Sequence, residues 1–273
     1  MDSKNGQLEI LVNAVLASSK YQDICQELIR SIASQELGKR RNLKEALKAT
    51  KNKLHQVAGA YLDARVHYAD WLNELSIAAQ QENKDKLFQL CTKFMSYHAS
   101  TRERIPILEQ FYTGIFSHLP PIRTVLDVAC GLNPLAIPWM PLAEHAEYYA
   151  GDIYHSMMDF LDSWMKISKV RGHTMACDVI QEPPTHKVDL AFILKAIPCL
   201  EQLDKAAPSR LLQTIQADHL VVSFPVHSLG GRRKGMTEHY ETQFRELVKH
   251  EPWEIKRLEF SSELVFVVNK LPH

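Results

Sequence analysis

The sequence has 273 residues, of which 45% are apolar, and this is enough for one large domain or for a domain with a substantial appendage. Lysine and arginine together number 32, as do aspartate and glutamate, so the overall charge neither requires nor excludes a polyanionic partner. The five cysteines lack CxxC spacing and no apolar run approaches about 18 residues, so we expect a cytoplasmic protein without a disulfide framework, a metal site or a membrane span.

The first region, residues 8–115, shows helical periodicity almost throughout and has no alternating apolar strands. Three apolar faces can be assigned to helices: Leu8, Leu11, Val12 and Val15; Ile24, Leu28 and Ile32; and Leu87, Leu90 and Phe94. The sequence therefore predicts an all-α N-terminal domain over residues 1–110 and a second domain over residues 111–273.

A basic segment lies within the helical region: "KRRNLKEALKATKNK", residues 39–53, has seven Lys or Arg residues and one acidic residue. If the segment is one helix, basic side chains form a strip beside an apolar stripe that begins at Leu43 and Leu47. The candidates for RNA binding are Arg40, Lys44, Lys48, Lys51, Lys53 and His55. A charge run is often only a solvated helix face, but the scarcity of compensating acids favours contact with a phosphate backbone.

After Leu119-Pro120-Pro121 the sequence changes to short apolar runs separated by helix-length segments. The runs are "RTVLDVA", "AEYYAGD", "HTMACDV", "VDLAFIL", "HLVVSFP", "WEIKRLEF" and "ELVFVVNK". The first five predict a parallel α/β sheet, and the last two, joined by Ser261-Ser262, predict a closing antiparallel hairpin. Such a terminal hairpin is typical of methyltransferases that use S-adenosylmethionine (SAM), whereas a dinucleotide-binding domain usually adds another parallel strand.

Acidic residues follow three successive strands of this predicted sheet. In an open parallel sheet the ligand lies beyond the carboxyl ends of the strands, where Asp127, Asp152 and Asp178 are expected. Asp152 is suited to accept hydrogen bonds from ribose hydroxyls, and Asp178 to accept one from an adenine amino group while Val179 covers the ring. Any one acid can be a simple turn residue, but three at successive strand ends favour a ligand site.

The turn after the first strand carries a single glycine, Gly131, followed by Asn133 and Pro134. A pyrophosphate needs several bare backbone N–H groups, which a glycine-rich turn supplies. SAM has no phosphate, so one glycine suffices beside its methionine part, and Pro134 can begin the next helix. The sequence therefore predicts SAM as the ligand.

A second basic cluster, "SLGGRRKGM" at residues 228–236, follows the fifth strand and so lies at the same edge of the sheet. We expect Arg232, Arg233 and Lys234 to contact phosphates and Met236 to pack against a displaced base. The alternative is a flexible loop that only aids solubility.

Four segments carry a resemblance to a known family: "HASTRER" (98–104), "DVACGLNPLAIPW" (127–139), "LKAIPCLE" (194–201) and "SFPVHSLGGRRKGM" (223–236). With them the chain resembles, from about Tyr21 to Asn269, the aminoglycoside-resistance 16S rRNA methyltransferases that modify N7 of guanine-1405. The resemblance implies a Rossmann-like class I SAM-dependent methyltransferase domain with a seven-stranded, mostly parallel sheet. It also implies a helical domain that docks on 16S rRNA in the 30S ribosomal subunit.

The resemblance also implies cofactor contacts, to which Gly131 is added. They are Tyr61, His98, Ala99, Ser100, Arg104, Ala129, Asp152, Asp178, Val179 and Leu194. Arg104 is expected to pair with the SAM carboxylate, because guanidinium and carboxylate match in a bidentate geometry. Leu203 departs from members of the family that have a polar residue there, so a cofactor contact from it is not expected.

The predicted chemistry needs no general base. The stretch from Leu194 to Pro198 does not match the polar motif that aligns exocyclic amines, and guanine N7 has an in-plane lone pair and no proton to lose. Catalysis is then positioning, with Lys195 and Met236 as candidates, although Lys195 can equally be a structural charge at a strand end. Because the A-form major groove is too narrow for side chains, the guanine must be exposed or flipped.

Three other functions remain open at this point. The target can be N1 of adenine-1408 or another RNA, or the chain can be a non-catalytic, SAM-responsive RNA-binding protein. A nicotinamide oxidoreductase is opposed by the missing glycines and by the closing hairpin. We expect a monomer.

Overall fold

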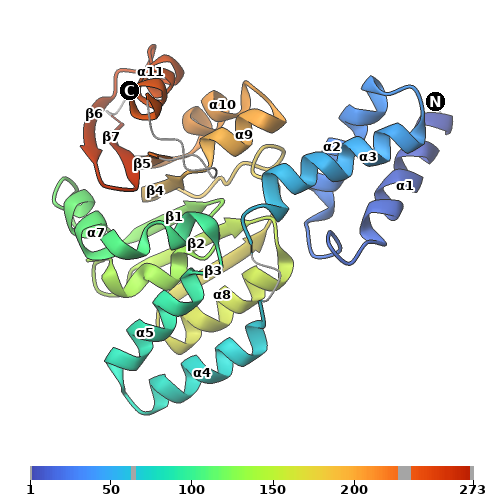
Figure 1. The fold of residues 1–273 in the computed structure, drawn as a ribbon. Helices are drawn as coiled ribbons and strands as arrows, with labels where there is room; N and C mark the ends of the chain where they lie inside the picture. The colour runs from blue at the N-terminus through green and yellow to red at the C-terminus, as the bar shows by residue number, and fades with distance from the viewer. Residues whose placement is uncertain (1, 63–65, 227–234, 271–273) are drawn as a thin grey trace.

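The computed structural model describes residues 2–62, 66–226 and 235–270. The first helices form a lobe at one side of the molecule (Figure 1): α1 (Asp2–Leu16), α2 (Gln26–Lys39), α3 (Leu43–Leu54) and the π-helical turn η1 (His55–Gly59). The predicted apolar faces form its interior, since Leu11, Val12, Leu28 and Ile32 are buried. We call residues 2–59 the helical lobe.

The next helices are not part of the helical lobe (Figure 1). They are α4 (Tyr68–Gln80), α5 (Lys84–Met95), α6 (Ala99–Arg102), the 3₁₀ turn η2 (Ile105–Ile107) and α7 (Leu108–Phe116). Helices α4 and α5 pack on α8 (His155–Ile167) and η3 (Asn133–Trp139), outside the sheet, and α7 packs on the sheet itself. Trp71 of α4 stacks on Phe94 of α5 at 4.4 Å and meets Phe160 of α8 edge-on at 5.6 Å. The packing therefore changes near residue 60, while the succession of helices continues to Phe116, before the first strand begins at Thr124.

The sheet has seven strands in the order β3-β2-β1-β4-β5-β7-β6. The strands are β1 (Thr124–Val128), β2 (Glu147–Asp152), β3 (Arg171–Ala176), β4 (Val188–Leu194), β5 (Ala217–Pro225), β6 (Glu254–Glu259) and β7 (Glu263–Asn269). Strands β1 to β5 are parallel, and β7 runs antiparallel to both β5 and β6. All seven predicted strands and the closing hairpin are confirmed.

The connections place helices on both faces of the sheet. They are η3 (Asn133–Trp139), α8 (His155–Ile167), α9 (Ile197–Leu203), α10 (Ala207–Thr214) and α11 (Met236–Leu247). The strand order reverses between β1 and β4, so the carboxyl ends of β1 to β4 meet at one edge, where α/β proteins bind ligands. Within the described ranges, no helix combines the length and the apolarity needed to cross a bilayer.

Candidate cofactor site

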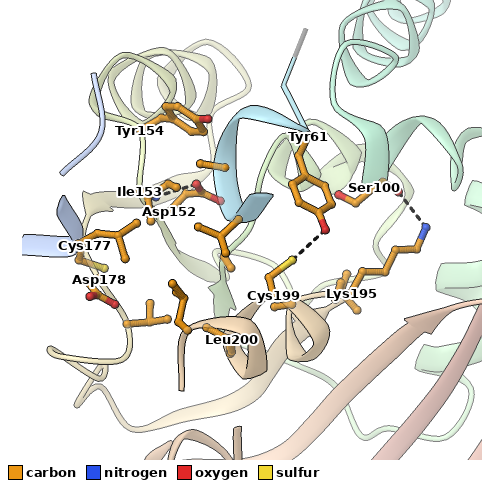
Figure 2. Close-up of a pocket in the computed structure, with 18 of the residues that line it drawn as sticks. Tyr61, Ser100, Asp152, Ile153, Tyr154, Cys177, Asp178, Lys195, Cys199 and Leu200 are labelled. Carbon is orange, nitrogen blue, oxygen red and sulfur yellow. Dashed lines mark hydrogen bonds between the residues drawn. The ribbon is translucent and has the colours of Figure 1, made fainter. Parts of the chain in front are cut away.

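A cavity of about 770 Å³, including its open mouth, lies at the carboxyl ends of these strands. Eight of the eleven predicted cofactor residues line it: Tyr61, His98, Ser100, Ala129, Asp152, Asp178, Val179 and Leu194. Figure 2 shows the two carboxylates at one end of the cavity and Lys195 at the other, with Tyr61 between them on the helical side. Ala99, Arg104 and Gly131 are not part of the lining.

The turn after β1 explains why one glycine is enough. Gly131 has φ +53°, in the left-handed region, and a Cβ there would lie 2.7 Å from Cε1 of His98. The backbone N–H of Gly131 donates to Asp152 Oδ2 at 2.8 Å, and that of Cys130 donates to the Gly151 carbonyl at 3.1 Å. Because the protein itself uses these donors, they are not available to a pyrophosphate, as the glycine-poor turn predicts.

Asp152 ends β2 and is 9% exposed. Its Oδ2 accepts from Gly131 N, and its Oδ1 accepts from Ile153 N at 2.7 Å. Burial raises the pKa of this carboxyl, against the lowering effect of the two backbone donors. A carboxylate has about four lone-pair sites, so Asp152 keeps acceptor capacity for the hydroxyl groups of a ligand.

Asp178 follows β3 and is 3% exposed. Its Oδ1 accepts from Ile180 N at 3.0 Å, while its Oδ2 is buried and finds no hydrogen-bond partner among the described residues. Burial raises the pKa of this carboxyl as well. A buried acceptor without a partner at a cavity wall fits a ligand that brings an N–H donor, and the neighbouring Val179 supplies apolar surface, as an adenine ring requires.

The expectation for Asp127 is corrected by the structure. Its side chain is fully buried, and its Oδ2 accepts from Tyr148 Oη at 2.6 Å and from Asn133 Nδ2 at 2.9 Å. Burial raises the pKa of Asp127 to about 6, although both hydrogen bonds act to lower it. Asp127 thus holds Asn133 and the turn from inside and does not line the cavity.

The expectation that Arg104 pairs with a ligand carboxylate is not supported either. Its guanidinium is 1% exposed, and Nε and Nη2 donate to the two carboxylate oxygens of Glu263 at 2.7 and 3.0 Å. Nη1 donates to Asn133 Oδ1 at 2.7 Å. The burial of Glu263 acts to raise its pKa, but the charges of Arg104 and Lys195 outweigh this effect and the pKa is lowered. Arg104 thus joins Glu263 of β7 to Asn133 in the turn after β1 and does not line the cavity.

Lys195 is a cation that lines the cavity. It follows β4 with φ +59°, and its Nζ lies 2.7 Å from Glu103 Oε2 and 3.3 Å from Glu263 Oε1. Nζ also donates to the Ser100 carbonyl at 3.2 Å, as Figure 2 shows. A left-handed conformation at a non-glycine residue is strained and occurs most often at functional sites.

His98 lies between Gly131 and Ser100. Its Nδ1 is 2.9 Å from Ser100 Oγ, and burial, followed by the charges of Arg104 and Lys195, lowers its pKa to about 4. The imidazole is therefore neutral near pH 7 and serves as a packing and hydrogen-bonding group.

Comparison with known proteins identifies the family. The family model for the ribosomal RNA methyltransferase FmrO matches residues 17–267. The chain belongs to this ribosomal RNA methyltransferase family. It is 34% identical over 266 residues to a 16S rRNA (guanine(1405)-N(7))-methyltransferase of Micromonospora rosea, with 97% of each chain covered.

Solved structures agree with the family assignment. The methyltransferase RmtF, solved in complex with S-adenosyl-L-homocysteine, matches with a TM-score of 0.82 at 28% identity, and 97% of this chain and 98% of that one are covered. The 16S rRNA methylase RmtB matches with a TM-score of 0.79 at 29% identity, with the same coverage. The chain is therefore a SAM-dependent methyltransferase, and the predicted fold class is confirmed.

The lining also includes residues that the sequence did not predict as cofactor contacts. The helical lobe supplies Leu28, Val57 and Ala58, and the turn after β2 supplies Ile153 and Tyr154. Leu203, from which no contact was expected, also lines the cavity. Helical periodicity shows that an apolar residue lies on the inner face of a helix. It does not show whether that residue packs in the core or lines a cavity.

The basic segment of this methyltransferase is not one helix. Helix α2 ends at Lys39, and Asn42 caps α3 by accepting a hydrogen bond from Glu45 N at 2.9 Å. Arg40 therefore leaves the predicted strip and pairs with Glu36, with Nη2 at 2.8 Å from Oε2. The remaining predicted residues are Lys44, Lys48, Lys51 and Lys53 on α3 and His55 at the start of η1.

Two further features concern the residues predicted to bind RNA. Lys20, which the sequence did not single out, places its Nζ 3.2 Å from Nδ1 of His55 and so adds a cation beside the strip. Met236 begins α11 and is half-buried. Arg232, Arg233 and Lys234 lie outside the described residues.

Proposed function

We propose that this methyltransferase transfers a methyl group from SAM to N7 of guanine-1405 of 16S rRNA and thereby confers aminoglycoside resistance. The relatives in Micromonospora rosea and Serratia marcescens, both 34% identical to the chain, are named for this reaction. One structural observation carries the cofactor part of the proposal. Among the described residues, Asp178 Oδ2 at the cavity is buried without a partner, while the backbone N–H groups of Cys130 and Gly131 are already bonded within the protein and so are not available to a phosphate.

Different residues of the cavity bind different parts of the cofactor. When bound, SAM supplies an electrophilic methyl group on its sulfonium. Asp152 accepts hydrogen bonds from the ribose hydroxyls, and Asp178 accepts one from the adenine amino group. The apolar side chains of Val179 and Leu194 exclude water from the ring. These roles follow from the donor and acceptor inventory of the residues.

No residue acts as an acid or a base in this proposal. Guanine N7 attacks with its own lone pair, and orientation of the two reactants supplies most of the acceleration. Lys195 is held at the cavity by Glu103 and Glu263, and Met236 is at the start of the helix that follows β5. We propose these two residues as positioning groups for the guanine.

The helical lobe is the proposed RNA-docking unit, which is smaller than the 1–110 domain expected from the sequence. Lys44, Lys48 and Lys51 lie on α3, and Lys20 adds a cation beside His55 at the end of α3. Phosphate contacts there offset the cost of exposing guanine-1405, which is a few kcal/mol for a flipped base. We place the enzyme in the cytoplasm, where 30S subunits are found, and expect it to act as a monomer.

Transfer of tritiated methyl from SAM to purified 30S subunits tests the proposal, with mass spectrometry of the 16S rRNA to identify the base. We expect 7-methylguanosine at position 1405, and cells that resist gentamicin and kanamycin while staying sensitive to apramycin. Methylation of adenine-1408 instead would show that the enzyme acts on a different base of the 16S rRNA. SAM binding without transfer would make the chain a non-catalytic RNA-binding protein.

A further inference from the structure

The turn after β2 is held from two sides. Asp152, Ile153 and Tyr154 all line the cavity. On the sheet side, Asp152 accepts a hydrogen bond from Gly131 N at its carboxylate, and its carbonyl accepts one from Cys177 N at 2.9 Å. The position of this turn therefore fixes one end of the cofactor cavity. We call residues 152–156 the cofactor turn.

The helical lobe holds the other side of the cofactor turn through backbone bonds. Cys25 N donates to the Ile153 carbonyl at 2.8 Å, and Ile24 and Tyr154 form an isolated antiparallel bridge. Ile24 and Cys25 immediately precede α2, so these bonds join the start of a lobe helix to the cavity floor. A displacement of the lobe cannot leave the cofactor turn unchanged.

Asp23 adds a side-chain contact at the same place. Its Oδ1 accepts from Ser156 N at 2.9 Å and its Oδ2 accepts from Ser156 Oγ at 2.5 Å, while its carbonyl accepts from His155 N at 2.9 Å. Tyr154, at the N-cap position of α8, makes no side-chain capping bond. A residue of the lobe, 133 positions away from Ser156, thus caps α8, and a carboxylate is favoured at a helix N-terminus.

The lobe also supplies part of the cavity wall. Leu28 of α2 and Val57 and Ala58 of η1 line the cavity, as does Tyr61, which follows the lobe directly. Tyr61 reaches across to the sheet domain, where its hydroxyl lies 3.1 Å from Cys199 Sγ (Figure 2). The cavity is therefore complete only when the lobe is seated on the cofactor turn.

We propose that Asp23 is a positioning residue that couples seating of the lobe to the cofactor turn, so that SAM and the 30S subunit bind cooperatively. This inference rests on the proposed function. A ligand in the cavity contacts both the lobe and the sheet domain, and RNA held by α3 must deliver its base to the same cavity. Both ligands then favour the seated arrangement, and each raises the affinity for the other by the same factor.

Calorimetry with S-adenosylhomocysteine, which has no methyl group to transfer, tests the coupling with and without saturating 30S subunits. For the wild type we expect the subunit to raise the affinity at least about fivefold. Asp23→Ala should weaken binding of S-adenosylhomocysteine alone roughly tenfold and abolish the rise. Asp23→Asn should keep the rise, because its amide oxygen still accepts from Ser156 N. Asp159→Asn, an exposed acid on α8, is the matched control.

Kinetics give a second readout. In Asp23→Ala the KM for SAM should rise while kcat at saturation of both substrates stays within about twofold of the wild-type value. If this variant does not fold, Ser156→Ala removes one of the two side-chain bonds and should reduce the rise in part. The inference is overturned if 30S subunits raise the affinity for S-adenosylhomocysteine as much in Asp23→Ala or Ser156→Ala as in the wild type. It is also overturned if they do not raise it in the wild type. Failure of the proposed function appears separately, as no methyl transfer to 30S subunits by the wild type.

Discussion

The imidazole of His98 lies directly over Gly131, so close that a Cβ on residue 131 would stand 2.7 Å from Cε1 of the ring. His98 comes from the segment that leads into α6, and Gly131 comes from the turn after β1. The contact therefore joins the segment before α6 to the turn that supports Asp152.

Gly131→Ala should abolish SAM binding. The left-handed φ of +53° costs a residue with a Cβ about 1–2 kcal/mol, and the ring of His98, which lines the cavity, must also shift. Calorimetry with S-adenosylhomocysteine measures the loss. Gly38→Ala is the control, because a Cβ at this helical position meets nothing within 4 Å and should stabilise the fold slightly. Wild-type affinity in Gly131→Ala would contradict the geometry.

The low pKa of His98 predicts a loss of stability in acid. The pKa is about 4 in the folded protein against an ordinary value of 6.5, so the unfolded chain binds the proton more readily. The stabilisation is fully present above pH 6.5 and is lost as the pH falls toward 4, at up to about 1.4 kcal/mol per pH unit.

Urea unfolding of the wild type and of His98→Asn over this range isolates the effect. The opposite contribution of Asp127, whose pKa is raised to about 6, is common to both proteins and cancels in the difference. The difference in unfolding free energy should shrink as the pH falls. A difference that does not change with pH would show that His98 titrates normally.

Asp178→Asn should weaken SAM binding about 10- to 100-fold, because the change replaces an unpartnered acceptor by a donor that faces the ligand's amino group. The melting temperature without ligand should not fall, since a buried carboxylate oxygen without a partner is itself unfavourable. Glu182→Gln, an exposed acid nearby in the same loop, should change neither quantity. An Asp178→Asn variant that binds SAM normally would remove Asp178 from the site.

Arg104→Met should destabilise the protein by about 3–5 kcal/mol, because it leaves the fully buried Glu263 without its main partner. Adding Glu263→Gln should recover part of this loss by removing the uncompensated charge. The measurement is chemical unfolding without ligand. If Arg104→Met instead kept its stability and lost only SAM affinity, the guanidinium would contact the cofactor as first expected.

Reversing the charge of Lys44, Lys48 and Lys51 together should abolish methylation of 30S subunits and leave SAM affinity nearly intact. The same change should reduce the salt dependence of subunit binding, because fewer counterions are released from the RNA. Lys84→Glu with Lys86→Glu, exposed on α5 away from the helical lobe, is the control. If the triple variant lost SAM affinity as strongly as methylation of 30S subunits, these lysines would not act in RNA binding alone.

The strands could be predicted from the sequence because each is a short apolar run whose period and length differ from those of the helices. The third strand shows the limit. It spans Arg171–Ala176 and so begins two residues before the run that starts at His173, while Asp178 follows the strand as expected and accepts from Ile180 N in the turn. Cavity residues carried by such strand ends could also be predicted, as Asp152 and Asp178 were.

Contacts between distant segments could not be predicted in this way. The Arg104 sequence context suggested a ligand, and only the fold brings Glu263 to it, 159 positions later. The prediction of one continuous basic helix was wrong for a local reason. Asn42 is the N-cap of α3, and this was not recognised within a strongly helical pattern. The packing of α4 and α5 on α8 and η3, and of α7 on the sheet, also depends on contacts that periodicity does not describe.

Strand β7 is the last strand in the chain but lies inside the sheet, between β5 and β6. Every residue that lines the cavity, from Leu28 to Leu203, is synthesised before Glu263. During translation the pocket walls therefore exist without the carboxylate that fixes Arg104 and Lys195. The ion pairs that hold Arg104 and Lys195 can therefore form only after β7, the last strand in the chain, has taken its place between β5 and β6.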